Sequence, residues 1–208
     1  MNSKLAVFDF DSTLMNGETI EIIADVLGIR GEVAQVTNMA MNGELDFFES
    51  LTHRVSLLKG ISVDKVNDIC HNLPYMNGAK EVIQGLKKRG YTVVCFSGGF
   101  KNATEYAKGI LHYDADFSNI LHSENGLLSG KVGGPMMFSD SKGVMLQRLQ
   151  SILNVTSKDT IVVGDGANDL SMFRLADTRI AFCAKDCLKK EATICIDKQD
   201  LSLILDLI

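Results

Sequence analysis

Short apolar runs of four to six residues recur along the chain, separated by longer segments with helical spacing of apolar positions. A continuous apolar run bounded by turn residues is typical of a strand that is covered on both faces, as in a parallel sheet. The pattern therefore predicts strands at 4–8 (KLAVF), Tyr91–Phe96, Thr160–Gly164, Arg179–Cys183 and Thr193–Ile196.

Amphipathic patterns lie between these runs and predict helices. They cover Gly78–Arg89, Lys101–Leu111, Ser141–Leu153, Asn168–Ala176 and the final segment 200–208. Strands that alternate with helices form a parallel sheet with helices on both faces. The chain is therefore predicted to be α/β, with a doubly wound parallel sheet forming a Rossmann-like core.

Two segments interrupt this alternation. The first, residues 15–76, contains four helical patterns without a strand, broken at Gly28, Asn42–Glu44 and Lys59–Ser62. We interpret it as a helical cap inserted into a core formed by residues 1–14 and 77–208. The second segment, Ile120–Val132, holds Asn125-Gly126 between short apolar runs, which predicts a β-hairpin.

Composition narrows the class of partner. The 208 residues carry a net charge of −5 and are 46% hydrophobic, so the surface lacks the basic excess that nucleic acid or an anionic membrane attracts. No apolar run approaches the ~20 residues of a membrane span, and Asp9 interrupts the N-terminal run. We expect a cytoplasmic protein with a small-molecule partner.

Cysteine and histidine indicate no chemistry of their own. The five cysteines are scattered and mostly embedded in apolar segments, which is typical of reduced core thiols. The four histidines lack the neighbours of a metal site or a nucleophilic triad.

Polar clusters follow three of the predicted strands. Asp9 and Asp11 end the first strand, Ser97–Gly99 (SGG) follows the second, and Gly164–Phe173 (GDGANDLSMF) follows the third. The carboxyl ends of parallel strands meet at the crevice where ligands bind. We therefore expect all three clusters to form one site.

The acids at these strand ends suit a metal. Acids two apart on a strand point the same way, so Asp9 and Asp11 face the crevice while Phe10 packs inward. Asp165 adds a third carboxylate, and clustered carboxylates need protons or a hard cation to neutralise them. An oxygen-only site with few ligands predicts Mg²⁺.

The same site suits phosphate. The Ser97 hydroxyl and the backbone N–H groups of SGG can hold the oxygens of an anion. Asp9 could then attack phosphorus to form an aspartyl-phosphate, with Asp11 as general acid and base. Taken singly, each feature could instead be a helix cap, a turn or a plain loop; their occurrence together at three strand ends favours the site.

Four pieces of the chain together resemble the signature of the haloacid dehalogenase-like phosphotransferases: DFDST (Asp9–Thr13), SGG, Lys142 and GDGAND (Gly164–Asp169). The resemblance extends over essentially the whole chain. The segments NGETIEIIA (16–24) and LTHRVSLLKG (51–60) are similar to the family members that hydrolyse O-phosphoserine. The resemblance implies Mg²⁺-dependent hydrolysis of O-phosphoserine to serine and phosphate, through an aspartyl-phosphate, as the last step of serine biosynthesis.

Roles follow from this resemblance for the acids. Asp9 would be the nucleophile and a Mg²⁺ ligand, and Asp11 the acid and base, which would also bind the metal through its backbone carbonyl. Asp165 would complete the protein ligands, and Asp169 would orient metal-bound water.

The resemblance also implies contacts to the substrate in the core. Ser97, the Gly98 amide and Lys142 would hold the phosphoryl oxygens, and Asn168 would contact the substrate. Taken alone, Lys142 reads as an exposed lysine at the start of a helix.

In the cap, the resemblance implies that Glu18 binds the substrate ammonium group and Arg54 its carboxylate, with Met41 and Phe47 lining the same pocket. Without the resemblance, Glu18 reads as an acid at a helix start and Arg54 as a solvated cation.

Two other functions remain open at this point. A signalling module that carries phosphate on aspartate also uses acids at strand ends, but it lacks a second acid two residues later and a helical lid. A related phosphatase or phosphotransferase could act on another small phosphomonoester. Phosphate release from a panel of substrates distinguishes these possibilities.

Overall fold

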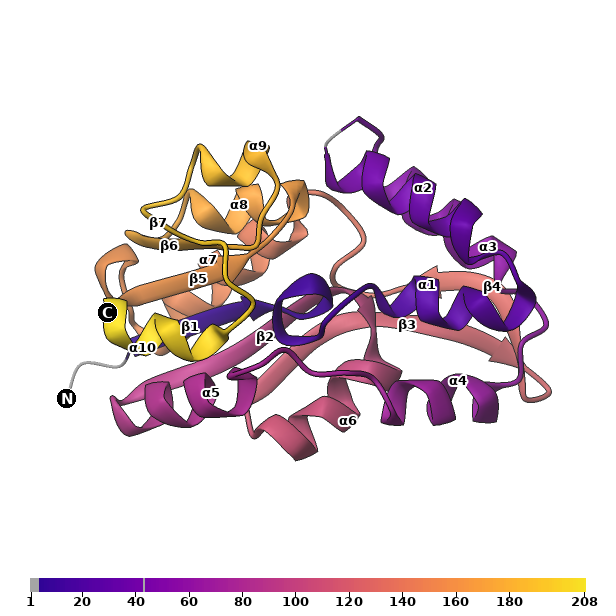
Figure 1. The fold of residues 1–208 in the computed structure, drawn as a ribbon, viewed down its shortest axis with the longest axis horizontal. Helices are drawn as coiled ribbons and strands as arrows, with labels where there is room; N and C mark the ends of the chain where they lie inside the picture. The colour runs from indigo at the N-terminus through magenta and orange to yellow at the C-terminus, as the bar shows by residue number, and fades with distance from the viewer. Residues whose placement is uncertain (1–3, 43) are drawn as a thin grey trace.

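The computed structural model describes residues 4–42 and 44–208, and its centre is a seven-stranded sheet (Figure 1). The spatial order of the strands is β4-β3-β2-β1-β5-β6-β7. All neighbours are parallel except β3 and β4. The strands are β1 (Lys4–Asp9), β2 (Tyr91–Phe100), β3 (Ala115–Glu124), β4 (Leu127–Gly133), β5 (Thr160–Gly164), β6 (Thr178–Phe182) and β7 (Ile194–Ile196).

The chain winds outward from the centre of the sheet in two directions. From β1 it passes to β2 and β3 on one side, then returns to β5 beside β1 and continues to β6 and β7. The order therefore reverses between β1 and β5, which is where an open parallel sheet forms its binding crevice. The predicted doubly wound α/β fold is confirmed.

Helices cover both faces of the sheet because side chains along each strand alternate between two apolar clusters. In β1, Ala6 and Phe8 join the cluster that packs against α5, α6 and α10, whereas Leu5 and Val7 join the cluster against α7, α8 and α9. Figure 1 shows these two groups of helices on opposite sides of the sheet. Their bounds are α5 (Ala79–Lys88), α6 (Lys101–Leu111), α7 (Ser141–Leu153), α8 (Leu170–Phe173), α9 (Asp186–Lys189) and α10 (Ile204–Leu207).

Four further helices gather beyond the carboxyl ends of the strands (Figure 1). They are α1 (Thr19–Ala24), α2 (Arg30–Met41), α3 (Phe47–Leu57) and α4 (Val63–His71). Gly28, with a φ of 70°, ends the short turn η2 (Asp25–Leu27) after α1, as its predicted break requires. The break predicted at 42–44 includes Gly43, which lies outside the described residues. Among the described helices, none is long and apolar enough to cross a bilayer.

The two chain segments that connect these helices to the sheet run side by side. The Asn16 N–H donates to the Pro74 carbonyl at 2.8 Å, and the Met76 N–H donates to the Leu14 carbonyl at 2.9 Å. Paired entry and exit segments are the geometry of an inserted unit. The division into a cap at 15–76 and a core at 1–14 and 77–208 stays a prediction.

The predicted hairpin is formed by β3 and β4. Its turn residues Asn125 and Gly126 both have positive φ, 51° and 78°, as a two-residue turn of this type requires. The hairpin extends beneath the helical segment, where Leu128 exchanges backbone hydrogen bonds with Gly60 and Ile61 at 2.9 and 2.8 Å.

Several elements differ from the sequence-based expectation. Strand β3 begins at Ala115, before the predicted hairpin; this start was not predicted because Asp116 interrupts the apolar pattern. The Asp116 side chain is 2% exposed and accepts a hydrogen bond from Thr104 Oγ1 at 2.8 Å. The predicted helix at 168–176 is a 3₁₀ turn, η4 (Ala167–Asp169), followed by the short α8. Helix α9 was not predicted.

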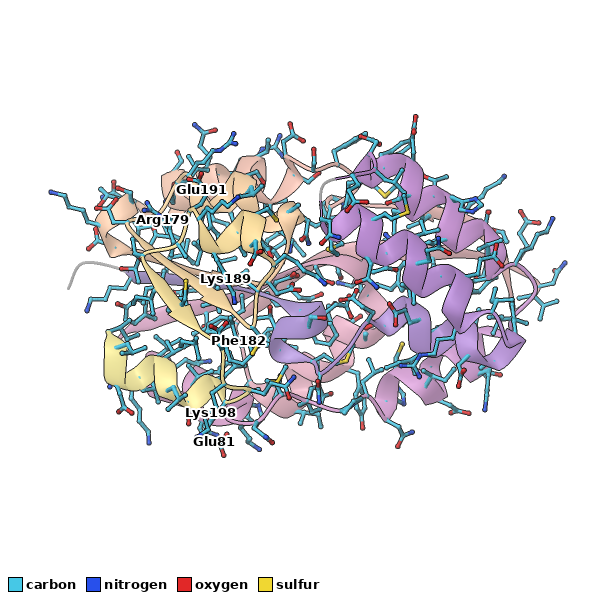
Figure 2. The ribbon with its side chains drawn as sticks, turned by 45° about the horizontal axis from the view of Figure 1, so that its top comes forward. Glu81, Arg179, Phe182, Lys189, Glu191 and Lys198 are labelled. Carbon is cyan, nitrogen blue, oxygen red and sulfur yellow. The ribbon has the colours of Figure 1, made fainter. Side chains whose placement is uncertain are left out.

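Charged side chains lie around β6, next to the edge strand β7, where Figure 2 labels Arg179, Lys189 and Glu191. Arg179 Nε donates to the Glu191 carbonyl at 2.7 Å, which ties β6 to the turn after α9. Phe182, also labelled in Figure 2, is fully buried at the carboxyl end of β6. This side of the sheet therefore has charged residues at its surface and an apolar interior around Phe182.

Candidate active site

The carboxyl ends of β1, β2 and β5 meet at the centre of the sheet and open onto a cavity. Helices α1, α2 and α3 contribute its opposite wall. The lining residues are Asp9, Asp11, Glu18, Ile20, Met41, Phe47, Leu51, Arg54, Gly98, Gly99, Phe100, Asp165 and Asn168. Strand ends and the helical segment thus enclose one space.

Lys142 connects two of the acids behind this cavity. Its Nζ lies 2.7 Å from Asp9 Oδ1 and 2.6 Å from Asp169 Oδ1, and the residue is only 3% exposed. Burial alone would lower the pKa of Lys142, but the carboxylates of Asp169 and Asp9 outweigh it and raise the pKa. Lys142 is therefore a buried ammonium group, and its interpretation as an exposed lysine at a helix start is wrong.

The burial of Lys142 follows from how closely α7 and α8 pack. A Cβ at Gly143 would lie 2.8 Å from the Ser171 carbonyl oxygen, so only glycine permits this approach. The first turn of α7 is thereby pressed against the residues that follow β5. The Lys142 side chain in this turn therefore points to Asp9 and Asp169 and away from solvent.

One oxygen of Asp9 is held by the protein. Asp9 Oδ1 accepts the Phe10 N–H at 2.7 Å in addition to the Lys142 ammonium group. Within residues 4–42 and 44–208, no hydrogen bond to Asp9 Oδ2 is found. This arrangement leaves Oδ2 available to bind a cation or to attack an electrophile.

Asp169 organises the loop after β5. Its Oδ2 accepts the N–H groups of Asp165 and Gly166 at 3.0 and 3.2 Å, while Oδ1 faces Lys142. A Cβ at Gly164 would lie 2.3 Å from Asp169 Oδ2, so glycine is required there. With both oxygens occupied, Asp169 fixes the backbone that presents Asp165.

Asp11 is oriented by the first residue of α1. Its Oδ1 accepts both the Thr19 N–H, at 2.9 Å, and the Thr19 hydroxyl. The other oxygen lies toward β2, because a Cβ at Gly99 would meet Asp11 Oδ2 at 2.6 Å. One oxygen is therefore anchored, and the other faces the strand ends where a reacting group would sit.

The donor set fits a hard divalent cation. Carboxylate oxygens of Asp9, Asp165 and Asp169 lie within 4.8 Å of one another, and all three residues are buried. Burial and the neighbouring Asp169 raise the pKa of Asp9 to about 7, and burial raises that of Asp165. Lys142 supplies one positive charge against three negative ones, so a cation would relieve the remaining repulsion.

An orphaned oxygen supports the same conclusion. Asn168 Oδ1 is buried and has no hydrogen-bond partner among the described residues. It lines the cavity beside Asp165. A buried acceptor without a partner indicates a missing donor or ion. The site could thus hold a metal among oxygen ligands only, which is the set that Mg²⁺ prefers.

The wall formed by the helices carries one cation and one acid. Arg54, on α3, is 3% exposed, and its hydrogen bonds go to the Ser50 carbonyl at 3.1 Å and the Thr37 hydroxyl at 2.9 Å. No carboxylate in the described part of the chain lies within salt-bridge distance of it. Burial lowers the pKa of Arg54, partly offset by Glu18. Its interpretation as a solvated cation is wrong.

Glu18 lies at the entrance to α1. Its Oε1 accepts the Ser12 hydroxyl at 2.6 Å, and burial together with Asp11 raises its pKa to about 8. A half-buried acid that lines the same cavity as a buried guanidinium group offers opposite charges to one ligand. A zwitterion is complementary to such a pair.

Apolar side chains from the helices close the cavity over the backbone of the core. A Cβ at Gly98 would lie 2.6 Å from Phe47 Cζ, and one at Gly166 would lie 3.0 Å from Met41 Sδ. The Phe47 ring and the Met41 thioether therefore rest directly on the backbone at the end of β2 and after β5, and a side chain at Gly98 would displace the ring.

The structure brings the predicted residues to this one place. Ser97, Lys142 and Asp169 lie behind the lining: the Ser97 hydroxyl oxygen accepts the Gly99 N–H at 2.9 Å, and Lys142 joins Asp9 to Asp169. The remaining predicted residues line the cavity. Their chemical roles stay predictions.

Sequence reasoning missed three lining residues, Ile20, Leu51 and Phe100, whereas Gly99 belongs to the predicted SGG cluster. Leu51 could have been found, because it lies four residues after Phe47 and three before Arg54 on one face of α3. Thr19 and Thr37 were also missed, although they bond Asp11 and Arg54. Nothing in their local sequence distinguishes them from other threonines.

Comparison with known proteins gives a consistent result. The phosphoserine phosphatase of Wolinella succinogenes is 58% identical over 202 residues, covering 97% of this chain and 98% of that protein. A solved phospho-aspartyl intermediate analogue of phosphoserine phosphatase superposes with a TM-score of 0.97 at 46% identity, covering 100% of both chains. A substrate-bound phosphoserine phosphatase complex gives a TM-score of 0.96 at 45% identity, covering 100% of this chain and 99% of that one.

The family itself is established by a match of the haloacid dehalogenase-like hydrolase model to residues 3–177. That range contains every acid of the cavity together with Lys142. The resemblance first noted in four short pieces of sequence therefore extends through the fold, and the chain belongs to the haloacid dehalogenase-like hydrolases.

Proposed function

We propose that this protein is a Mg²⁺-dependent phosphoserine phosphatase, which hydrolyses O-phosphoserine to serine and phosphate. The observation that carries the proposal is the buried Arg54 guanidinium group, which has neutral hydrogen-bond partners and lines the same cavity as Asp9. A buried cation without an anion is costly, and a substrate carboxylate would supply the anion. The similarity to phosphoserine phosphatases over nearly the full chain supports this choice.

Each end of the substrate has a partner. Arg54 binds the carboxylate and Glu18 the ammonium group, while Met41 and Phe47 enclose the carbon atoms between them. At the other end Ser97, the Gly98 N–H and Lys142 hold the phosphoryl group, and Asn168 contacts the substrate. Because the amino-acid groups and the phosphoryl group have different partners at opposite ends of the cavity, the substrate binds in one direction.

The first displacement uses Asp9. Its free Oδ2 bonds to phosphorus while the bond from phosphorus to the substrate's ester oxygen breaks, and Asp11 gives that oxygen a proton. Lys142 holds Asp9 Oδ1 at 2.7 Å, which directs Oδ2 toward the substrate. The products of this step are serine and an aspartyl-phosphate at Asp9.

The second displacement restores the protein. Water attacks phosphorus, Asp11 accepts its proton, and the bond between phosphorus and Asp9 Oδ2 breaks to release phosphate. Asp9 and Asp165, with the Asp11 backbone carbonyl, would hold Mg²⁺, and Asp169 would keep Asp165 in place through the backbone. When bound, the metal neutralises charge on the phosphoryl oxygens.

The proposal extends to organisation and setting. Residues 15–76 form a cap that confers substrate specificity, because Glu18, Met41, Phe47 and Arg54 all belong to it. The reaction is the last step of serine biosynthesis and occurs in the cytoplasm. The five free cysteines support a reducing compartment.

A substrate panel tests the proposal. Phosphate release is measured from O-phosphoserine and from phosphomonoesters that lack its carboxylate or its ammonium group, each with Mg²⁺ and with a chelator. We expect hydrolysis of O-phosphoserine to be preferred and to require the metal. A preferred substrate without the amino-acid groups would indicate another phosphomonoesterase, and a stable aspartyl-phosphate without release would indicate a signalling module.

A further inference from the structure

Asn119 on β3 is fully buried and lies outside the residues that line the cavity. Its Nδ2 donates to the Gly98 carbonyl and to the Met136 carbonyl, both at 3.0 Å, and its Oδ1 accepts the Met136 N–H at 2.9 Å. One side chain thus joins the end of β2 to the segment that leads into α7. Ser97 lies in the first segment, and Lys142 lies in the first turn of α7, directly after the second.

The bond to Gly98 determines the direction of an N–H group. The Gly98 carbonyl and the Gly99 N–H belong to one trans peptide unit, so they point in opposite directions. Because Asn119 holds the carbonyl, the N–H is aimed away from β3, and it donates to Ser97 Oγ at 2.9 Å. The position of the Ser97 hydroxyl oxygen therefore depends on Asn119.

The orientation of the hydroxyl proton follows. Ser97 is fully buried, and the Gly99 N–H is the one hydrogen-bond partner found for its oxygen in the described part of the chain. With a lone pair occupied by this N–H, the hydroxyl proton is free to be donated to a ligand. Hydrogen bonds in such a chain polarise one another, which strengthens the last donor.

We propose that Asn119 is a positioning residue for phosphoryl binding: through the Gly98–Gly99 peptide it aims the Ser97 hydroxyl at the phosphoryl oxygens. This inference rests on the proposed function for the identity of the ligand. It differs from a purely structural role, in which Asn119 satisfies buried backbone groups and has no effect on the affinity for phosphate.

Asn119→Leu, which has nearly the same volume, removes all three hydrogen bonds, and Asn119→Ala admits water and serves if the leucine variant does not fold. The probe is inorganic phosphate, titrated calorimetrically into each Mg²⁺-loaded protein. We expect both variants to bind phosphate about 10- to 100-fold more weakly, the size of a hydrogen bond to a charged group. KM for O-phosphoserine should rise more than kcat falls.

A matched control removes a buried hydrogen bond between α6 and the same strand, β3. The Thr104 hydroxyl bonds to Asp116 and Ser118 at 2.8 Å and is also fully buried, but it has no bond to the Ser97–Gly99 segment. Thr104→Val should lower the urea midpoint of unfolding and leave the phosphate affinity unchanged. A loss of stability alone therefore does not imitate the expected result.

A double-mutant cycle with Ser97→Ala tests the route. If Asn119 acts through the Ser97 hydroxyl, Asn119→Ala should weaken phosphate binding less than twofold in the Ser97→Ala background. Losses that multiply, or wild-type phosphate affinity in the Asn119 variants, overturn the inference, as does a wild-type protein that does not bind phosphate. A wild type that binds phosphate but does not hydrolyse O-phosphoserine refutes the proposed function only, since the cycle still decides the role of Asn119.

Discussion

Replacement of Arg54 by alanine tests how the cavity selects its substrate. The guanidinium group is 3% exposed and bonds to a carbonyl and a hydroxyl, so a substrate carboxylate beside it would be an ion pair shielded from water. Loss of one partner from such a pair costs about 2–5 kcal/mol. At about 1.36 kcal/mol for each tenfold change, kcat/KM for O-phosphoserine should fall roughly 30- to 5,000-fold.

The assay compares two substrates. Phosphoethanolamine keeps the phosphate and the ammonium group but has no carboxylate. Arg54→Ala should therefore change its kcat/KM by only about threefold or less, because this substrate has no carboxylate that loses its partner. Arg148→Ala, at an exposed position of α7, controls for the loss of an arginine elsewhere. Thermal unfolding of each variant is measured to check that the folded fraction equals that of the wild type.

Equal losses for the two substrates would refute the reasoning. Such a result would mean that Arg54 supports the shape of the cavity and does not read the carboxylate. The roles proposed for Asp9, Lys142 and Ser97 at the phosphate end would be unaffected, because Arg54 bonds to Ser50 and Thr37 and to none of these residues.

Three further predictions concern the acids and the helical segment. Asp9→Asn should abolish both turnover and covalent phosphorylation, whereas Asp11→Asn should retain Mg²⁺ binding and lose about 10²–10⁴-fold in kcat; turnover near the wild-type rate in Asp9→Asn would exclude the covalent route. Because burial raises the pKa of Glu18 to about 8, the metal-free folded state binds its proton more tightly than the unfolded state, so urea stability should fall as the pH rises from about 5 to 8. Glu18→Gln should make that pH dependence smaller, and an unchanged profile would contradict the assignment. Hydrogen exchange across Glu18–Leu73 should slow when a phosphate mimic and Mg²⁺ are added, and exchange that is unaffected would exclude closure of this segment over the substrate.

The sequence by itself determined the elements that depend on local pattern. Strand β5 and helices α6 and α7 have the bounds that the sequence predicts, because continuous apolar runs and helical spacing are local properties. The Asn125-Gly126 turn followed for the same reason, since positive φ at two successive residues demands such a pair.

The sequence also located the acids. Asp9 and Asp165 follow apolar strands, and the topology of a doubly wound sheet places the ends of such strands together. The four short pieces of the family signature then identified Lys142, which composition and spacing leave indistinguishable from a surface lysine. A catalytic site on a regular sheet can therefore be predicted from the sequence when its residues directly follow strands.

Only the tertiary structure decided which polar groups lost their water. Lys142 and Arg54 are buried because α7 packs against α8 and α3 faces the strand ends, and both contacts join segments that are distant in the sequence. Asn119 gained its partners from segments 21 and 17 residues away in the chain. Hydrogen bonds between distant segments depend on how the helices pack on the sheet. The periodicity of one segment indicates only which of its faces is apolar, so it does not predict these bonds. For this reason the acids could be predicted from the sequence, but neutral groups such as Thr19, which orients Asp11, could not.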